Sequence, residues 1–366
     1  MRVLIAGGGT GGHYFPALAV GEELLKRGFT PFYVGSKGGI EGRLGFPPAK
    51  ESLYLSHSSL RGRGALSVLR APSYGASLVK VLSFVKRVKP EAVLIFGGYS
   101  SLPAGLAAAL FRIPLLIQEQ NSIPGKTNRY LSRAAREGYL GFSSAKEYLA
   151  CPSIFTGNPL RKEIVETAKN LTEEKKREFK ERLGLEPDLK TLLIVGGSQG
   201  ALWINRLVER AISGLPEGIQ VIHVTGRGKE GRLRELYAGR GIKALVLPFY
   251  ERIWELYGAA DGAVSRAGAL AMSELSAFRI PTLYIPYPYA ADNHQLENAL
   301  YLSKRGGALV YTQEELSVEL FLQSLEALLF DIIGRERMRG VMAELFPLNA
   351  TQRVASEIEK WIEKRS

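Results

Sequence analysis

The sequence predicts an α/β protein with two doubly wound parallel sheets. The first observation is a series of apolar runs that are bounded by turns and followed by helical periodicity: VLIAGGG, TPFYVG, AVLIFGG and PLLIQEQ. The second is a later series with the same pattern: TLLIVGGSQG, IQVIHVTG, ALVLPF, GAVSRAG and PTLYIP. Strands that alternate with helices form parallel sheets covered on both faces, so each series predicts one domain.

The boundary between the domains is expected near TGNPLR, where an Asn-Pro pair favours a turn. The predicted domains are therefore residues 1–157 and 158–347. They are followed over 348–366 by a helical segment that includes the amphipathic stretch TQRVASEIEKWIEKRS and is expected to pack back on the first domain. No low-complexity linker separates the two series, so we expect the domains to meet across a cleft.

The composition indicates a packed, soluble protein. The chain has 366 residues, of which 46% are hydrophobic and 23% charged. Its longest uncharged stretch, Ala92–Phe111, contains several glycines and a proline, and fits strand, turn and helix better than a membrane span. The first residues lack a signal-peptide cleavage pattern, which predicts a cytoplasmic location. A single cysteine excludes an intramolecular disulfide.

The positive charge is concentrated in the first half of the chain. Residues 1–157 contain 19 Lys and Arg against 8 Glu and no Asp, whereas residues 158–366 contain 29 basic against 28 acidic residues. This asymmetry suggests that the first domain faces a polyanion, such as nucleic acid, anionic lipid or a phosphorylated substrate. Scattered solvating charge is the alternative.

Three turns share one design: GGGTGGH at 7–13, GGYSS at 97–101 and GGSQGA at 196–201. Glycines after a strand let the backbone approach a ligand, and the helix that follows presents free N–H groups that suit phosphate. Gly7, Gly9 and Gly12 also satisfy the dinucleotide pattern GxGxxG. However, the next strand, FYVGSKGG, ends without the acidic residue that would hold a ribose.

Two further patterns argue against a metal-dependent nucleotide site. QNSIPGKT at 120–127 has a glutamine where a phosphate loop needs its first glycine, and the four aspartates offer no DxD pair. The four histidines are too dispersed to indicate a metal cluster. His13 lies at a helix start, where the dipole disfavours the imidazolium and a neutral ring can accept a proton. A structural or hydrogen-bonding role is the alternative.

Eight ordered motifs closely resemble the MurG family along almost the whole chain: GGTGGHYFPALA, LRGRG, GGYSS, QEQNSIPGKTN, TGNPLR, GGSQGA, SRAGALAMSE and DNHQLENA. The resemblance implies the GT-B glycosyltransferase fold, with two Rossmann-like domains and a deep interdomain cleft. It implies an inverting transfer of N-acetylglucosamine from UDP-N-acetylglucosamine (UDP-GlcNAc) to the 4-hydroxyl of the muramoyl sugar of lipid I, undecaprenyl-pyrophosphoryl-MurNAc-pentapeptide. The product would be lipid II, for peptidoglycan synthesis.

The same resemblance implies where the enzyme works and what it needs. No metal and no cofactor is expected, and no nucleic acid. The expected location is peripheral, on the cytoplasmic face of the plasma membrane, with an anionic membrane surface and other cell-wall synthesis proteins as partners. The first domain would bind the acceptor and the membrane, and the second would bind the UDP-sugar.

The resemblance also assigns roles to individual residues. His13 would be the general base, or would only orient a hydroxyl. The GGYSS turn would receive the acceptor's diphosphate through Gly97, Gly98, Tyr99 and Ser100. The donor-binding set comprises Thr10, Gly11, Gly12, Asn121, Arg161, Ser198, Tyr250, Arg266, Ala269, Leu270, Glu274 and Gln295.

Several of these assignments have structural alternatives. Ser198 could serve only as a helix N-cap, and Glu274 only as a solvated helix residue. Gln295 forms a D-x-x-Q capping box with Asp292. At Tyr250 the chain departs from the family, because it has Tyr-Glu-Arg where the family usually has Ile and two acids.

A basic segment interleaved with apolar residues predicts the membrane contact. Basic groups attract anionic headgroups while apolar side chains enter the interface, although at least half of the apolar residues are equally compatible with burial against the sheet. The predicted patch comprises Arg61, Arg63, Leu66, Leu69, Arg70 and Lys80. The alternatives are another GT-B transferase with a different nucleotide sugar and, from charge alone, a nucleic-acid-binding protein, which the lack of clustered aromatic residues argues against.

Overall fold

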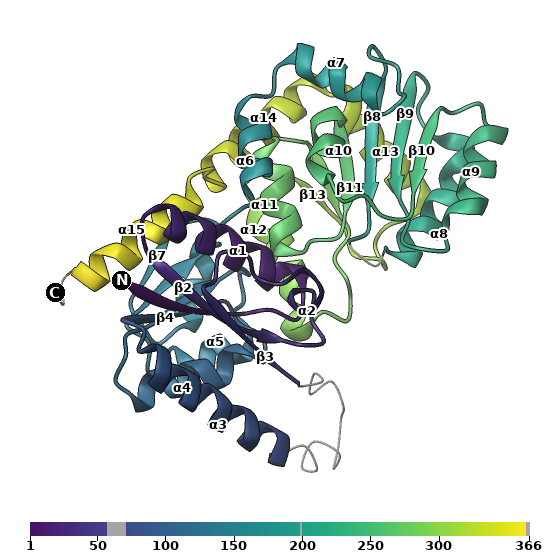
Figure 1. The fold of residues 1–366 in the computed structure, drawn as a ribbon. Coiled ribbons are helices and arrows are strands. Elements are labelled where there is room, and N and C mark those ends of the chain that lie inside the picture. Colours follow the sequence, from purple (N-terminus) through teal and green to yellow (C-terminus); the bar gives the residue numbers. More distant parts are fainter. Residues whose placement is uncertain (57–70, 198–199, 364–366) are drawn as a thin grey trace. The chain divides into compact units, whose positions relative to one another are not determined.

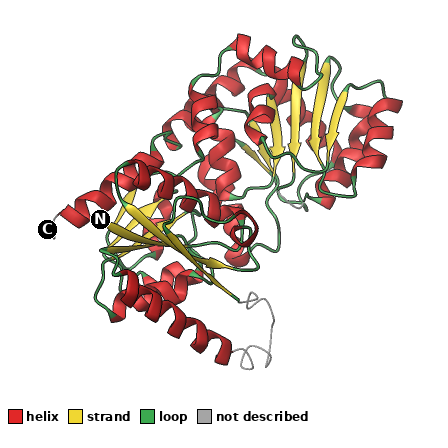
Figure 2. Ribbon diagram, viewed as in Figure 1, coloured by secondary structure: helices red, strands yellow, loops and turns green. Residues whose placement is uncertain are grey.

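The computed structural model describes residues 1–56, 71–197 and 200–363. The chain divides into two compact units. Unit 1 comprises Met1–Arg161 together with Leu348–Ser366, and unit 2 comprises Lys162–Pro347. Each unit is a parallel sheet with helices on both faces, as Figures 1 and 2 show. The predicted fold class, two doubly wound parallel sheets, is confirmed.

Unit 1 contains a seven-stranded sheet in the order β3-β2-β1-β4-β5-β6-β7. All neighbouring strands pair in parallel. The strands are β1 (Arg2–Ala6), β2 (Thr30–Ser36), β3 (Glu51–Leu55), β4 (Ala92–Ile95), β5 (Leu115–Glu119), β6 (Glu137–Leu140) and β7 (Ser153–Phe155). The described helices are α1 (Gly11–Lys26), α2 (Glu41–Leu44), α3 (Ala71–Val88), α4 (Ser101–Leu110), α5 (Lys126–Leu131), the 3₁₀ helix η2 (Ser143–Tyr148) and α15 (Ala350–Glu363).

The inner strand β1 shows why this sheet is buried on both faces. Its side chains alternate between two hydrophobic cores, with Val3 and Ile5 in one and Leu4 and Ala6 in the other. Helices α1 and α15 contribute to the first core, and α3 and α4 to the second (Figure 1). A strand with two buried faces is a continuous apolar run, which is the pattern seen in VLIAGGG.

The C-terminal helix α15 is an integral part of unit 1. Val354, Ala355 and Ile358 of this helix lie in the core beside α1. Arg27, the C-cap residue of α1, donates to Glu359 at 3.2 Å, and the Trp361 indole donates to Glu137 at 2.8 Å. Burial of an apolar stripe thus holds α15 against the first sheet.

Unit 2 contains a six-stranded parallel sheet in the order β10-β9-β8-β11-β12-β13. The strands are β8 (Lys190–Val195), β9 (Ile219–Val224), β10 (Ala244–Leu247), β11 (Gly262–Ser265), β12 (Thr282–Tyr284) and β13 (Leu309–Val310). The helices are α6 (Lys162–Lys169), α7 (Glu173–Arg182), α8 (Leu202–Ala211), η3 (Ile212–Gly214), α9 (Glu230–Gly239), α10 (Ile253–Ala259), α11 (Ala269–Ala277), η4 (Ala291–Asn293), α12 (His294–Ser303), α13 (Val318–Phe330) and α14 (Ile332–Leu345).

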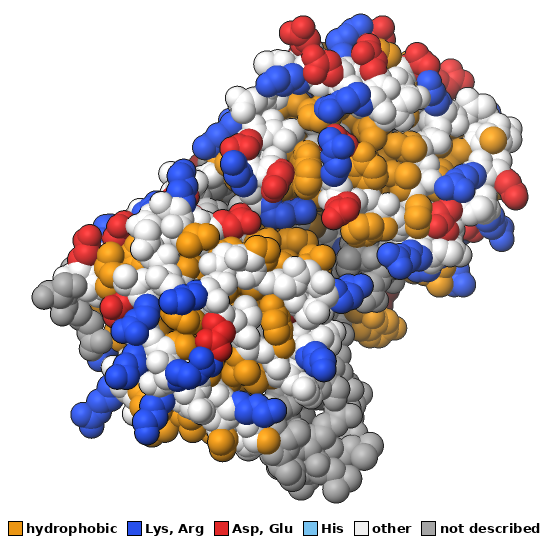
Figure 3. All heavy atoms as spheres, viewed as in Figure 1, with side chains coloured by type: hydrophobic (Ala, Val, Ile, Leu, Met, Phe, Trp, Pro, Cys, Tyr) orange, Lys and Arg blue, Asp and Glu red, His pale blue; other side chains and the backbone are white. Residues whose placement is uncertain are grey.

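Helix length and surface charge both bear on the predicted membrane contact. In the described part of the chain, no helix has the length and apolarity needed to cross a membrane. On the face drawn in Figure 3, basic side chains on unit 1 are more numerous than acidic ones. This distribution follows from the excess of Lys and Arg in the first half of the sequence.

Candidate active site

Both sheets reverse their strand order at one position, and the glycine turns lie there. In unit 1 the reversal falls between β1 and β4, which are followed by GGGTGGH and GGYSS. In unit 2 it falls between β8 and β11, which are followed by GGSQGA and by the RAG turn. Ligands of open α/β sheets bind at the carboxyl ends of strands at such switch points. The topology therefore places one candidate binding edge in each unit.

The two turns of unit 1 contact each other and His13. Gly97 has a φ of +90°, and a Cβ added there would lie 3.2 Å from His13 Nε2. Gly98 has a φ of +82°, and its added Cβ would lie 2.8 Å from the Gly8 carbonyl oxygen. Both positions combine a left-handed backbone with a close approach, which favours glycine. The glycines let the GGYSS turn lie directly against the imidazole.

His13 is the third residue of α1 and is partly buried. Thr10, the N-cap residue, has an extended backbone, and its side chain makes no cap hydrogen bond. Instead, the Thr10 Oγ1 atom lies 3.3 Å from His13 Nδ1. The hydroxyl thus restrains one ring nitrogen, while the other lies beside the GGYSS turn.

A buried glutamate that the sequence analysis missed supports the first turn. Glu41 is fully buried, and its carboxylate accepts hydrogen bonds from the Gly9 N–H at 2.8 Å and the Ser36 N–H at 2.7 Å. A Cβ at Gly8 would lie 2.1 Å from its Oε1 atom. Glu41 therefore acts as a positioning residue for the turn that carries Thr10. The segment IEGRLG contains no motif that could have indicated this.

A second buried carboxylate organises QEQNSIPGKT. Glu119 accepts hydrogen bonds from the Asn121 N–H at 2.9 Å, the Asn128 side chain at 2.8 Å and the Gly125 N–H at 3.2 Å. Burial raises the pKa of this carboxyl group, and the hydrogen bonds oppose the shift. Asn121, predicted to bind the donor sugar, is held by Glu119 through its backbone and its side chain.

The predicted acceptor residues lie at the start of α4. Tyr99 is 37% exposed, whereas Ser100 is 3% exposed and precedes the first helical residue, Ser101. Among the described residues, the Ser100 hydroxyl has no hydrogen-bond partner. A buried hydroxyl without a partner is costly, and here it lies at a helix N-terminus, which favours anions.

In unit 2, α11 places Glu274 and the backbone of Ala269 and Leu270. The helix begins at Ala269, directly after the RAG turn, so its first N–H groups lie at the switch point. Glu274 is 6% exposed, and its carboxylate accepts a hydrogen bond from the Tyr257 hydroxyl at 3.1 Å. The alternative that Glu274 is a solvated helix residue is wrong.

Arg266 and Gln295 are linked through Tyr287. The Arg266 guanidinium donates to the Ile285 and Pro286 carbonyls, at 3.0 Å each, and lies 5.6 Å from the centre of the Tyr287 ring. Burial lowers the pKa of Arg266 to about 10. The Gln295 Oε1 atom accepts a hydrogen bond from the Tyr287 N–H at 3.0 Å.

The capping-box alternative for Gln295 is not formed. Helix α12 begins at His294, and its N-cap is Asn293, not Asp292. Both Asp292 and Asn293 have left-handed backbones, and the N-cap side chain makes no cap hydrogen bond. The spacing D-x-x-Q matched the motif, but the backbone turns away before the helix starts.

Three further residues of the predicted donor-binding set are Tyr250, Arg161 and Ser198. Tyr250 donates a hydrogen bond to Glu255 at 2.6 Å, and both burial and this contact raise its pKa. Arg161 belongs to unit 1, where its guanidinium lies 4.5 Å from the centre of the Phe15 ring on α1. Ser198 lies outside the described residues.

Most of the predicted membrane patch also lies outside the described residues, namely Arg61, Arg63, Leu66, Leu69 and Arg70. Lys80 is exposed on α3. Val85 of the same helix is buried in the core, which agrees with the alternative that apolar residues of this segment pack against the sheet. Next to Lys80, Val79 is 65% exposed, and Leu110, at the end of α4, is 66% exposed.

Two family models match this chain. The model of the glycosyltransferase family 28 N-terminal domain matches residues 3–139, and that of the family 28 C-terminal domain matches residues 191–344. The chain belongs to glycosyltransferase family 28. This glycosyltransferase is 40% identical over 357 residues to the UDP-N-acetylglucosamine--N-acetylmuramyl-(pentapeptide) pyrophosphoryl-undecaprenol N-acetylglucosamine transferase of Aquifex aeolicus (strain VF5), with 97% of this chain and 99% of the relative covered.

Two further similar proteins support the same family assignment. The protein of the same description from Methylococcus capsulatus (strain ATCC 33009 / NCIMB 11132 / Bath) is 39% identical to this glycosyltransferase, with 97% of each chain covered. The crystal structure of Acinetobacter baumannii MurG matches it with a TM-score of 0.76 and 28% identity, over 98% of this chain and 99% of that one. The resemblance of this glycosyltransferase to the MurG family is confirmed.

Proposed function

We propose that this glycosyltransferase transfers N-acetylglucosamine from UDP-GlcNAc to N-acetylmuramyl-(pentapeptide) pyrophosphoryl-undecaprenol, lipid I, with inversion, and so forms lipid II. The observation that carries the proposal is the near full-length identity of 40% to a relative whose name describes this transfer. The candidate binding edges of both sheets support it, because each carries residues predicted to bind the donor or the acceptor.

On the donor side, α11 has the groups that a nucleoside diphosphate needs. The N–H groups of Ala269 and Leu270 at the helix start would bind phosphate oxygens. Arg266 would add positive charge, and the Glu274 carboxylate would accept hydrogen bonds from the ribose hydroxyls. Gln295, fixed against the Tyr287 backbone, would bind the sugar.

On the acceptor side, His13 would take the proton from the attacking 4-hydroxyl. As that oxygen bonds to the anomeric carbon, the bond from this carbon to the UDP oxygen breaks and UDP leaves with the electron pair. The proton would go to His13 Nε2 in the tautomer whose Nδ1–H donates to the Thr10 hydroxyl. The buried hydroxyl of Ser100, at the start of α4, would bind the acceptor's diphosphate.

The proposal is tested by incubating the protein with labelled UDP-GlcNAc and a lipid I analogue, with and without EDTA. A β-1,4-linked disaccharide product is expected in both samples. Absence of the product would contradict the transfer, and loss of activity only with EDTA would contradict a metal-independent mechanism. UDP-glucose and UDP-galactose serve as competing donors to test for a transferase of different sugar specificity.

Replacing Glu274 by glutamine is expected to weaken UDP-GlcNAc binding about 10- to 100-fold, because hydrogen bonds to a charged group contribute about 1.5–3 kcal/mol each. The measurement is calorimetric titration with UDP-GlcNAc. Glu326→Gln is the matched control, since Glu326 is exposed on α13. Equal affinity of Glu274→Gln and the control would rule out the ribose contact.

We further propose that unit 1 attaches to an anionic membrane surface on the cytoplasmic side. The described support is a set of exposed apolar and basic side chains on α3 and at the end of α4, two helices that pack together. It comprises Val79, Lys80, Leu110, Phe111 and Arg112. Together with the basic segment from Arg61 to Arg70, these side chains have the chemistry of an interfacial patch.

Reversing the charge of Lys80 and Arg112 to glutamate is expected to reduce sedimentation with anionic vesicles at least tenfold, because each basic residue near such a surface contributes about 1 kcal/mol. The affinity for UDP-GlcNAc should not change. The control is Lys169→Glu with Lys304→Glu, an equal charge change at exposed positions of unit 2. If both double variants sediment equally, net charge alone explains the binding.

A further inference from the structure

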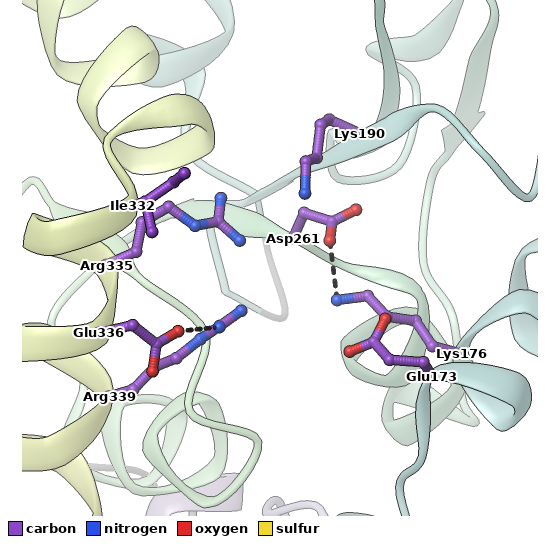
Figure 4. Close-up of a pocket in the computed structure, with 8 residues that line it drawn as sticks. All are labelled: Glu173, Lys176, Lys190, Asp261, Ile332, Arg335, Glu336 and Arg339. Atoms are coloured by element: carbon purple, nitrogen blue, oxygen red, sulfur yellow. Dashed lines mark hydrogen bonds and ion pairs between the residues drawn. The ribbon is translucent and has the colours of Figure 1, made fainter.

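Unit 2 has a polar cavity at the edge of the sheet opposite the predicted nucleotide site. Lys190 is the first residue of β8, and Asp261 immediately precedes β11. The turns predicted to bind UDP follow the other ends of these two strands. The cavity has a volume of about 310 Å³ and lies between α7 and α14 (Figure 4).

A buried ion cluster forms one wall of this cavity. The Asp261 carboxylate, 6% exposed, contacts Lys176 Nζ at 2.8 Å and Lys180 Nζ at 2.9 Å. Lys180 also donates to the Leu189 carbonyl at 2.8 Å. One carboxylate therefore serves two buried ammonium groups. Burial lowers the pKa of Lys176, because the single shared carboxylate does not fully compensate the desolvation.

The opposite wall adds further positive charge. Arg335, 6% exposed, donates through Nη1 to the carbonyls of Leu328 and Leu329 at the end of α13. Figure 4 shows its guanidinium, the Arg339 side chain and the Lys190 ammonium pointing into the space between the two walls. In the described part of the chain, no carboxylate forms an ion pair with Arg335 or Lys190, whereas Arg339 pairs with Glu336 at 2.5 Å.

The charges do not balance. Four cations and three carboxylates line the cavity: Lys176, Lys190, Arg335 and Arg339 against Glu173, Asp261 and Glu336. A fifth cation, Lys180, does not line the cavity but shares the Asp261 carboxylate with Lys176. Glu173 is exposed, so it compensates the buried cations weakly. Such an excess of partly buried positive charge is unfavourable unless an anion joins it.

We propose that this cavity binds a phosphate or diphosphate group. A phosphate group carries about 1.5 to 2 negative charges at pH 7, which would offset the excess positive charge of the lining and of the neighbouring Lys180. Guanidinium groups bind phosphate oxygens in pairs, and lysines add point charges. The volume accommodates a diphosphate or a small phosphorylated molecule. This site is separate from the donor site and does not depend on the proposed transfer.

The test measures the melting temperature with inorganic phosphate or pyrophosphate, in the presence of saturating UDP so that the nucleotide site is occupied. Sodium chloride of equal ionic strength is the reference. We expect a rise of about 2–4 °C, the effect of roughly 1 kcal/mol of ligand stabilisation on a domain of this size. The rise should be lost in Lys190→Gln and in Arg339→Gln, two variants outside the buried Asp261 cluster.

The control variant is Lys304→Gln, which removes an exposed lysine that does not line the cavity. It should keep the full rise. The proposal is overturned if neither anion raises the melting temperature of the unmodified protein, or if all variants respond equally. A rise with a polyglutamate peptide alone, lost in the same two variants, would also overturn it and indicate an acidic protein segment instead.

Discussion

Replacing His13 by alanine is expected to lower the turnover number about 10²- to 10⁴-fold, the usual contribution of a general base. The affinity for UDP should change little, because the predicted nucleotide contacts come mainly from unit 2. The loss of turnover is expected because of the geometry around His13 in unit 1. The Thr10 hydroxyl lies 3.3 Å from His13 Nδ1, and the GGYSS turn lies against the rest of the ring. Steady-state kinetics with a lipid I analogue measures the effect.

Two further variants separate a base from a residue that only orients the acceptor. His13→Gln keeps hydrogen-bonding groups but cannot take a proton, so its turnover should be as low as that of His13→Ala. Thr10→Val removes the hydroxyl beside Nδ1, and we expect a smaller loss, of about tenfold, with the acidic limb of the pH–rate profile retained. Near-normal turnover of His13→Gln would show that His13 merely holds the hydroxyl.

The fold was predictable because its determinants are local in sequence. Strands such as β1 are apolar on both faces, and the glycine turns mark where they end. The right-handed crossovers of doubly wound sheets then restrict the strand orders that are possible. The switch points coincide with three of the glycine-rich turns, so the sequence alone indicated where both candidate sites lie.

The buried charges were not predictable, because their partners are distant in sequence. Glu41 contacts the turn at Gly9 across 32 positions, and Lys180 contacts Asp261 across 81. The stretch LTEEKKREFKERLG has the composition of a solvated helix, yet Lys176 and Lys180 on α7 are buried. Periodicity could not identify this face of α7, because its buried residues include charged ones. Gln295 shows the reverse case. The D-x-x-Q spacing of a capping box is present in the sequence, but Asp292 is not the N-cap residue of α12, so the capping box is not formed.

Replacing Asp261 by asparagine is expected to lower the free energy of unfolding of unit 2 by about 3–5 kcal/mol, the usual cost of removing one partner from a buried ion pair. The carboxylate contacts both Lys176 and Lys180 and accepts the Thr191 N–H at 2.9 Å. Asparagine keeps one oxygen but turns an amide N–H₂ toward an ammonium group. Urea denaturation followed by tryptophan fluorescence measures the loss, since Trp203 and Trp254 lie in unit 2.

The pH dependence of this loss identifies its electrostatic origin. Burial alone would raise the pKa of Asp261, but Lys176 and Lys180 lower it to about 2, below the value of about 3.9 in an unfolded chain. Because the folded-state pKa is the lower one, the stabilisation is present above about pH 4 and is lost as the pH falls toward about 2. The difference between the unmodified protein and Asp261→Asn should therefore shrink by about 2 kcal/mol over this range.

Asp188→Asn is the matched control for this pair of measurements. The Asp188 carboxylate forms an ion pair at 2.5 Å with Arg177, which lies on α7 as Lys176 and Lys180 do. The Asp188 side chain is 78% exposed, so we expect the free energy of unfolding to fall by at most about 1 kcal/mol. Equal losses in the two variants would mean that burial does not strengthen the Asp261 cluster. A difference between the unmodified protein and Asp261→Asn that stays constant from pH 5 to pH 2 would instead indicate altered packing.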